Sequence, residues 1–173
     1  MRIISGKYKH KKIDGFSLKN TRPTMDRVKE SMMAMIQDYI PNSTVLDLFA
    51  GTGNLGIEAL SMGAKEGYFV DIDHEAIKTI KNNLMGIEES HIVLKKDYNQ
   101  AIKYFMDNNI KFDIILLDPP YNKIDLDKLI NKILDNNLLN KDGIIVVEAQ
   151  EQLNFNIIKQ KKISDKTISV IKS

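Results

Sequence analysis

The stretch VLDLFAGTGNLG, residues 45–56, combines an apolar strand, a glycine-rich turn and the start of a helix. Glycines at such a turn let the backbone pass close to a ligand, and the first turn of the helix offers N–H groups without partners. The stretch therefore predicts a site for a nucleotide-like ligand. A phosphate-binding P-loop would need Lys and Ser or Thr directly after Gly56, but Ile57 and Glu58 follow it, which disfavours triphosphate hydrolysis.

An acid inside this strand narrows the choice of ligand. A dinucleotide site would also use Gly51, Gly53 and Gly56, with Asp71 as the acid about twenty residues further on. Asp47, however, is a carboxylate in an apolar strand, which is costly unless it has a partner. A diphosphate needs no anion beside it, whereas S-adenosylmethionine carries an ammonium and a sulfonium group. Asp47 therefore favours S-adenosylmethionine, and the alternative is that it caps the next helix or pairs with a lysine.

Strands and helices alternate around this stretch. We expect strands at 44–49, 67–71, 92–94, 112–117 and 143–148, and helices at 54–62, 74–85, 98–106 and 126–134. The strands at 45–49 and 114–117 are apolar almost throughout, as strands covered on both faces should be. Two more strands, at 156–163 and 167–171, should form a hairpin that closes the sheet. The expected fold class is α/β, a doubly wound Rossmann-like sheet of seven strands whose last hairpin is antiparallel.

The beginning of the chain precedes this alternation. Segments 2–5 and 9–13 are expected to form a small β-hairpin around Gly6, and a helix capped by Thr24 should follow. Residues 1–13 contain few large apolar side chains, so we expect little burial there.

Charge is unevenly distributed, although the net charge of the 173 residues is only +2. Residues 1–40 carry nine Lys and Arg against four Asp and Glu, residues 41–150 eleven against seventeen, and residues 151–173 five against two. A basic segment before an acidic body indicates contact with a polyanion or, alternatively, a solubilising tail.

A second polar motif, LDPPY at 117–121, follows the fourth expected strand, at the carboxyl edge where such sheets bind ligands. The carboxylate of Asp118 and the carbonyl of Pro119 can both accept from an exocyclic NH2 group and direct its lone pair toward an electrophilic methyl group. Two prolines restrict the chain so that both acceptors converge, and Tyr121 offers a ring face to a base. Together with the glycine turn, the motif predicts methylation of an amino group, with Asp118, Pro119 and Tyr121 as catalytic residues.

These motifs resemble those of the class I methyltransferases, and among them the bacterial enzymes that methylate the exocyclic N2 of a guanine in 16S ribosomal RNA. The similarity covers nearly the whole chain and includes RIISG at 2–6, RPTMDRVKE at 22–30 and the closing pair Lys166-Thr167. It implies that the substrate is 16S ribosomal RNA within a small-subunit particle. It also implies that the cofactor S-adenosylmethionine is held by Asp47, Gly51 and Gly53 at the methionine part, Asp71 at the ribose and Asp97 at the adenine. Taken by itself, Asp97 could equally be only a helix cap.

On this resemblance, residues 1–40 are expected to be an RNA-binding extension and residues 41–173 the methyltransferase domain. The expected RNA contacts are Arg2, Lys7, Lys9, Lys11, Lys12, Arg22 and Arg27. The alternative for Arg22 and Arg27 is pairing with Asp26 or Glu30, which would serve only the fold.

Two other functional classes stay open at this point. One is an amino-methyltransferase acting on DNA adenine or cytosine or on a protein amide, although the chain leaves no room for a separate target-recognition domain. The other is a nicotinamide-dependent reductase, which would share the glycines and Asp71 but needs a proton donor and a substrate domain. The chain has no Cys and only three distant His, so we expect no metal site. With no apolar run near the roughly 20 residues that span a bilayer, we expect no membrane contact and a cytoplasmic, monomeric protein.

Overall fold

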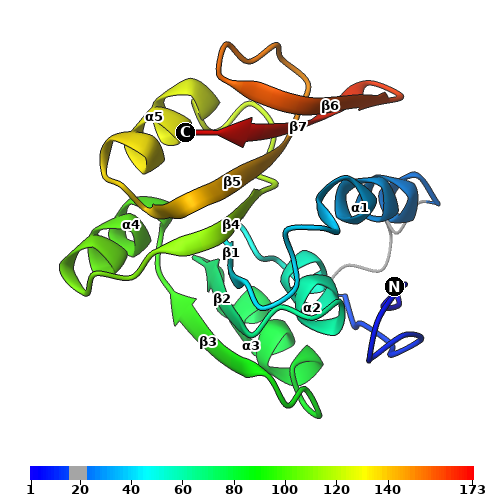
Figure 1. Ribbon diagram of the computed structural model, residues 1–173. Coiled ribbons are helices and arrows are strands. Elements are labelled where there is room, and N and C mark those ends of the chain that lie inside the picture. Colours follow the sequence, from blue (N-terminus) through cyan, green and yellow to red (C-terminus); the bar gives the residue numbers. More distant parts are fainter. Residues whose placement is uncertain (16–22) are drawn as a thin grey trace.

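The computed structural model describes residues 1–15 and 23–173, which contain seven strands in one sheet of order β3-β2-β1-β4-β5-β7-β6 (Figure 1). The strands are β1 (Thr44–Asp47), β2 (Glu66–Asp71), β3 (Ser90–Lys95), β4 (Phe112–Leu117), β5 (Leu139–Ala149), β6 (Ile157–Ile163) and β7 (Lys166–Lys172). The helices are α1 (Pro23–Ile36), α2 (Asn54–Ser61), α3 (His74–Asn83), α4 (Tyr98–Asp107) and α5 (Leu126–Asp135). The first five strands are parallel, and β7 and β6 are antiparallel. The predicted α/β fold with its closing antiparallel hairpin is confirmed.

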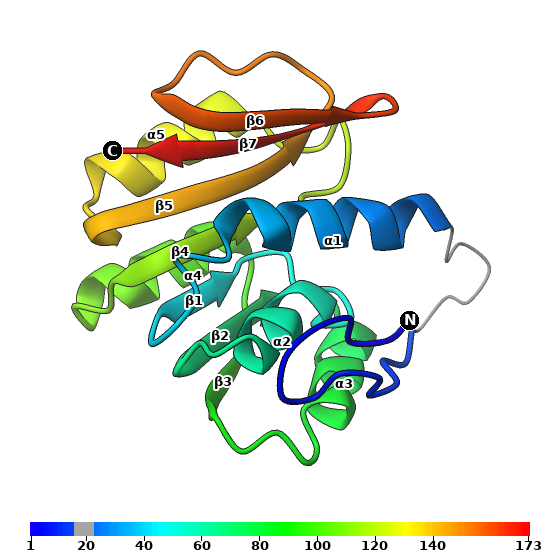
Figure 2. The ribbon, with the colours of Figure 1, turned by 45° about the vertical axis from the view of Figure 1, so that its right-hand side comes forward.

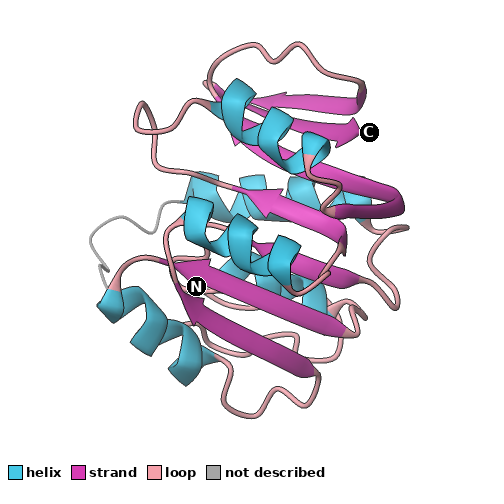
Figure 3. Cartoon of the chain, turned by 90° about the vertical axis from the view of Figure 1, so that its left-hand side faces the viewer, coloured by secondary structure: helices cyan, strands magenta, loops and turns pink. Residues whose placement is uncertain are grey.

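Two layers of helices cover the two faces of the sheet. Helices α1, α2 and α3 pack on one face and α4 and α5 on the other, so that helices lie in front of and behind the strands in Figure 3. Strand β4 shows why its sequence is apolar throughout: Ile114 and Leu116 pack toward the first layer, and Ile115 and Leu117 toward the second. All four side chains are fully buried, as expected for a parallel strand between two helical layers.

The order of the strands places a crevice at one edge of the sheet. Strand β1 pairs with β2 on one side and with β4 on the other. The chain therefore winds in opposite directions from β1, and in such sheets the loops at the carboxyl ends of these two strands separate and leave room for a ligand. Asp47 ends β1 and Asp118 directly follows β4, so both predicted site acids lie at this position.

Residues 1–15, here called the arm, follow the path of a hairpin but do not form the two predicted strands. A single antiparallel bridge joins Arg2 and Lys12. Backbone hydrogen bonds also cross the arm from Ile3 N–H to the Lys11 carbonyl, from His10 N–H to the Ile3 carbonyl and from Ile13 N–H to the Met1 carbonyl, at 2.8–2.9 Å. The predicted small hairpin is therefore present, without two extended strands. The N–H groups of Ile4 and Ser5 donate to the carboxylate of Glu58 in α2 at 2.9–3.1 Å.

The expectation of little burial in the arm is wrong. Ile3 and Ile13 are each only 1% exposed and belong to the same core cluster as α1, α2 and the sheet. Gly6 has a φ of 83°, and a Cβ at this position would collide with the backbone of Ser61 in α2. Residues 1–40 therefore share one core with residues 41–173, and an RNA-binding role for this extension stays a prediction.

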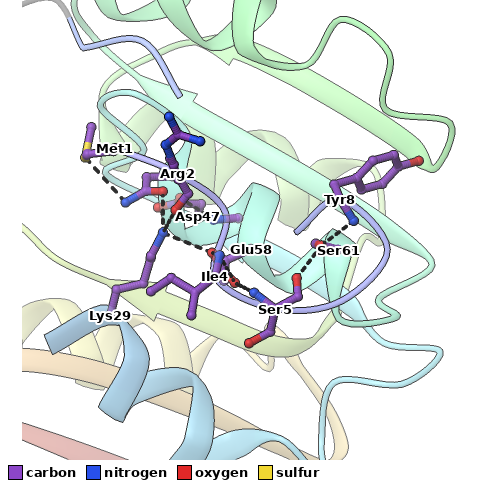
Figure 4. A network of polar contacts seen from close by, with 11 residues as sticks. Met1, Arg2, Ile4, Ser5, Tyr8, Lys29, Asp47, Glu58 and Ser61 are labelled. Atoms are coloured by element: carbon purple, nitrogen blue, oxygen red, sulfur yellow. Dashed lines mark hydrogen bonds and ion pairs between the residues drawn. The ribbon is translucent and has the colours of Figure 1, made fainter. Parts of the chain in front are cut away.

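A buried ion pair joins the arm, α1 and α2 (Figure 4). The ammonium of Lys29 lies 3.0 Å from Glu58 Oε2, and the two side chains are 2% and 1% exposed. Lys29 also donates to the carbonyl of Arg2 at 2.8 Å and to Asn54 Oδ1 at 2.9 Å. Because the arm N–H groups complete the partners of Glu58, the charges are fully hydrogen-bonded, which a buried ion pair requires.

Some predicted boundaries shift. Strand β5 begins at Leu139 rather than 143, and α3 ends at Asn83 rather than 85. Arg22 and the side chain of Thr24, the predicted cap of α1, lie outside the described part of the chain. Over residues 1–15 and 23–173, no helix combines the length and apolar character needed to cross a membrane.

Candidate functional site

A cavity of about 730 Å³ opens at the carboxyl edge of the sheet, within the size range of small-molecule sites. The glycine turn, residues 50–54, forms one wall, and the loop after β4 forms another. Met1 of the arm and the first turns of α1 also line it. Six predicted site residues line it, together with Glu148 and Lys166: Gly51, Asp71, Asp97, Asp118, Pro119 and Tyr121.

The glycine turn brings the backbone to the cavity. Gly51 has a φ of 56°, and a Cβ added there would meet nothing within 4 Å. Gly53 has a φ of 82° and is the N-cap of α2 without a side-chain cap. Both residues therefore adopt left-handed backbone that favours glycine. A ligand can approach closely at Gly51, whereas Gly53 does not line the cavity and a Cβ there would meet Ile57 at 3.3 Å and Ile80 at 3.5 Å.

Asp47 supports this turn from behind and is not among the residues that line the cavity. Its Oδ2 accepts the Gly56 N–H at 3.0 Å, so the helix-capping alternative holds for one oxygen. Its Oδ1 is buried and, among the described residues, has no hydrogen-bond partner. Burial raises the pKa of Asp47 to about 7, the Gly56 hydrogen bond opposes this, and the charge of Asp71 adds to it. The structure thus leaves one buried acceptor beneath the turn.

Asp71 lies at the cavity wall and is fixed by backbone donors. Its Oδ2 accepts from the Gly51 N–H at 2.8 Å, and its Oδ1 accepts from the Asp73 N–H at 2.9 Å. Each carboxylate oxygen keeps further acceptor capacity, which two adjacent hydroxyl groups of a sugar could use. Asp73 caps α3 as predicted, accepting from the N–H groups of Glu75 and Ala76.

Asp97 lines the same cavity beyond Asp71. Its side chain accepts the Gln100 N–H at 2.9 Å and forms a capping box at the start of α4. The helix-cap alternative is therefore present in the structure, and the predicted contact of Asp97 with an adenine amino group stays a prediction.

The loop after β4 meets two residues that the sequence analysis did not assign. The hydroxyl of Tyr121 donates to Glu148 Oε1 at 2.5 Å, and the ammonium of Lys166 lies 2.8 Å from the same oxygen. Lys166 also lies 5.3 Å from the centre of the Tyr121 ring. Glu148 is only 5% exposed although it lines the cavity. An acid near the end of an apolar strand at this edge is the signal that identified Asp118, and it could have identified Glu148.

The charges in this group influence one another. Asp118 is open to the cavity, but protein surrounds it on its other sides, and this burial raises its pKa to about 7. The negative charge of Glu148 raises the pKa further, Lys166 lowers it, and Asp47 adds a smaller rise. Burial also raises the pKa of Tyr121 to about 12, with the hydrogen bond to Glu148 as the next cause.

Lys166 stays charged in this setting. Burial alone would lower the pKa of its ammonium group, but hydrogen bonds with Glu148 and Tyr121 outweigh this effect and raise the pKa above its usual range.

The arm, which carries five of the predicted RNA contacts, runs beside α2 and α3 (Figure 2). Lys7 lies 2.7 Å from Glu88 and 3.3 Å from Glu89, and Lys12 lies 3.8 Å from Asp14. Lys11 donates to the Met85 carbonyl at 2.9 Å, and Lys9 is exposed. Arg27 is exposed on α1, close in sequence to the cavity-lining residues Met25 and Val28.

Comparison with known proteins adds to this geometry. Residues 1–172 match the family model described as "Conserved hypothetical protein 95". The chain is 41% identical over 157 residues to the Bacillus subtilis "Putative rRNA methyltransferase YlbH", covering 90% of this chain and 85% of that protein. It is 32% identical to the Haemophilus influenzae "Ribosomal RNA small subunit methyltransferase D", covering 93% and 88%. Among solved structures, "Putative methyltransferase yhhF" from Escherichia coli superposes with a TM-score of 0.82 at 27% identity, covering 98% and 96%.

Proposed function

Since the chain belongs to the family described as Conserved hypothetical protein 95, with ribosomal RNA small subunit methyltransferases D among its relatives, we propose that it methylates 16S ribosomal RNA. The acceptor is the exocyclic N2 amino group of a guanine, and S-adenosylmethionine is the methyl donor. One observation carries the proposal: a single cavity joins a glycine turn beside Asp71 to the open carboxylate of Asp118. The names of the relatives favour ribosomal RNA over DNA, protein amides and nicotinamide-dependent reduction.

The residues of the first wall fit S-adenosylmethionine. Asp71 presents a carboxylate toward which two ribose hydroxyls can donate, and Asp97 lies farther along the same wall for the adenine. Gly51 leaves open space for the methionine part, and the free Oδ1 of Asp47 beneath the turn offers negative charge to its ammonium group. When bound, this cofactor supplies a methyl group on a positively charged sulfur, which is already an activated electrophile.

The protein then contributes alignment and charge. Asp118 accepts one N–H of the guanine amino group and the Pro119 carbonyl accepts the other, so that the nitrogen lone pair points out of the ring plane. Tyr121, held by Glu148, presents its ring to the base. Positive charge that develops on the nitrogen is stabilised by the ionised carboxylate of Asp118, and the surplus proton leaves the nitrogen to this carboxylate or to water.

Basic residues supply the wider RNA contact in this proposal. Lys9, Lys11 and Arg27 have no carboxylate partner among the described residues, so they are available to phosphates. The substrate is placed within a small-subunit particle, whose folded RNA would present the target base.

The test uses small ribosomal subunits from a strain that lacks this protein. Incubation with labelled S-adenosylmethionine and the full chain should give label in N2-methylguanosine at one position of 16S RNA. The Asp118→Ala variant is the matched control and should bind cofactor without transferring label. Label in another nucleoside, or none despite cofactor binding by calorimetry, would overturn the proposal.

A further inference from the structure

The second wall of the cavity carries three charged groups close together. The ammonium of Lys166 lies 2.8 Å from Glu148 Oε1, and the carboxyl of Asp118 lies within hydrogen-bonding reach of the Glu148 carboxylate. All three residues line the cavity. The wall therefore presents one donor, Lys166, and two acceptors, Glu148 and Asp118, and Glu148 neighbours both of the others.

These groups keep unused hydrogen-bonding capacity. Tyr121 and Lys166 both bind Glu148 through Oε1, and no described residue donates to Oε2. Asp118 has the carboxyl of Glu148 as its side-chain hydrogen-bonding neighbour, and two carboxyl groups can share only one proton, so Asp118 also keeps free acceptor capacity. Lys166 has three N–H donors, which its contacts with Glu148 and Tyr121 do not exhaust. Two adjacent carboxylates repel each other, and Lys166 is the cation that contacts Glu148; burial first and the charge of Glu148 second raise the pKa of Asp118.

Guanine has the complementary edge. Along its Watson–Crick side it presents the O6 acceptor, the N1–H donor and the N2 amino donor. Adenine presents an amino donor and then an acceptor, and cytosine presents an amino donor followed by two acceptors, so both would oppose this wall. Enzymes that act on an extruded base read it through hydrogen bonds to this edge.

Resting on the proposed function, we propose that Glu148 and Lys166 select guanine: Lys166 donates to O6, and Glu148 accepts from N1–H while Asp118 accepts from N2. The same contacts fix which amino group reaches Asp118. Glu148 has a second task, because its hydrogen bond to the Tyr121 hydroxyl holds the ring against which the base lies. Lys166 approaches that ring within 5.3 Å of its centre.

The closing hairpin thereby gains a role in the site. Strand β7 pairs antiparallel with β5, with Ile168 opposite Glu148 and Thr167 opposite Ala149. Lys166, directly before Thr167, therefore begins β7 at the carboxyl end of β5, where Glu148 lines the cavity. An eighteen-residue separation in sequence becomes a 2.8 Å contact through this topology.

The experiment uses small-subunit particles reconstituted with rRNA that carries either guanine or 2,6-diaminopurine at the methylated position. Diaminopurine keeps the 2-amino group but replaces O6 by a donor and N1–H by an acceptor. The wild-type chain should prefer guanine by about 100-fold or more in kcat/KM, because the wrong base leaves buried polar groups unpaired. If wild type methylates both bases equally, the inference fails whatever the variants do.

Substitutions test whether Lys166 and Glu148 cause the preference for guanine. Lys166→Met and Glu148→Gln should reduce it below about tenfold, and Glu148→Gln should also gain activity on diaminopurine relative to guanine, because its amide can donate to N1. Lys172→Met is the control, since this lysine lies at the other end of β7 and pairs with Asp142. Calorimetry with S-adenosylmethionine verifies that each variant is folded. Unchanged base preference in folded variants overturns the inference, whereas no N2-methylguanosine from wild type overturns the proposed function instead.

Discussion

The two walls of the cavity both carry acidic side chains, but the hydrogen-bond partners of these side chains differ. On the first wall, formed by the ends of β1, β2 and β3, Asp71 accepts two backbone N–H groups and Asp97 accepts one. On the second wall, formed by the ends of β4 and β5 and the start of β7, Asp118 lies beside Glu148, and Lys166 is the cation that contacts Glu148.

The first wall has its hydrogen bonds made by the protein itself before a ligand binds. Backbone donors on the first wall are fixed by the glycine turn and by helix starts, so its geometry is set by folding. On the second wall, Tyr121 and Lys166 both bind Glu148 through Oε1, so acceptor capacity remains on Glu148 Oε2 and Asp118 that a base could use. Changes that undermine the first wall should affect stability and cofactor binding, whereas changes on the second should affect transfer and base choice.

The largest effect should come from the ion pair that supports the first wall. Lys29→Met leaves the buried Glu58 without its cation, and we expect the free energy of unfolding to fall by about 3–5 kcal/mol. Urea denaturation measures this change. Lys161→Met on exposed β6 is the control and should change stability by less than about 0.5 kcal/mol. Equal stabilities of the two variants would show that the Lys29–Glu58 ion pair does not stabilise the fold.

On the second wall, Asp118→Ala should lower the rate of methyl transfer by about 100- to 1,000-fold, the scale of losing one preorganised polar group. Cofactor affinity and unfolding free energy should stay close to wild type, because no described residue depends on Asp118 as a hydrogen-bond acceptor. Single-turnover assays with saturating cofactor measure the rate. Lost cofactor affinity with normal transfer at saturation would reverse the roles assigned to the two walls.

The corresponding change on the first wall is Asp71→Ala. It removes hydrogen bonds to the ribose and the acceptors of the Gly51 and Asp73 N–H groups, so cofactor binding should weaken by about 2–4 kcal/mol. Calorimetric titration with S-adenosylmethionine measures the loss. Asp107→Ala, an exposed acid of α4, is the control. Wild-type affinity in folded Asp71→Ala would remove this residue from the cofactor site.

The pH dependence of methyl transfer tests Asp118 on the second wall without changing a residue. Protonated Asp118 is a weaker acceptor and has no negative charge to stabilise the positive charge that develops on the nitrogen. Its pKa is raised to about 7, so transfer at saturating substrates should rise from about pH 6 to 8. The rise is at most about tenfold per pH unit for one group. Burial is the main cause of the raised pKa, followed by the charge of Glu148, and Lys166 lowers it, so Lys166→Met should move the rise to higher pH. A flat profile in both proteins would contradict the assignment of Asp118.

Sequence patterns predict the first wall better than the second. The glycine turn, Asp71 and the cap at Asp73 are local, because a strand, a turn and a helix start lie within a few residues of one another. Glu148 and Lys166 meet only because β7 lies between β5 and β6, an order that the chain sequence does not specify. The position of Glu148 is predictable in part, because this acid follows a run of apolar residues at the edge of the sheet where ligands bind.

The arm shows a second limit of sequence patterns. Ile3 and Ile13 are two apolar residues in a basic segment, and nothing local indicates that both enter the core. From the sequence, Glu58 only argues against a P-loop, but in the structure its carboxylate binds the arm backbone and Lys29. Such tertiary partners of a helix acid depend on packing rather than on neighbouring residues.

The smallest effect should come from the arm's lysines, whose positions beside the first wall make them a test of where RNA lies. Each phosphate contact contributes up to about one unit to the slope of log binding constant against log salt concentration. Lys7 already neighbours Glu88 and Glu89, so Lys7→Ser should leave the slope nearly unchanged. Lys9→Ser and Lys11→Ser should each flatten it by up to about one unit, because neither has a carboxylate partner among the described residues. Filter binding of small subunits at several salt concentrations measures the slopes, and no change in any of the three would place the RNA entirely beside the second wall.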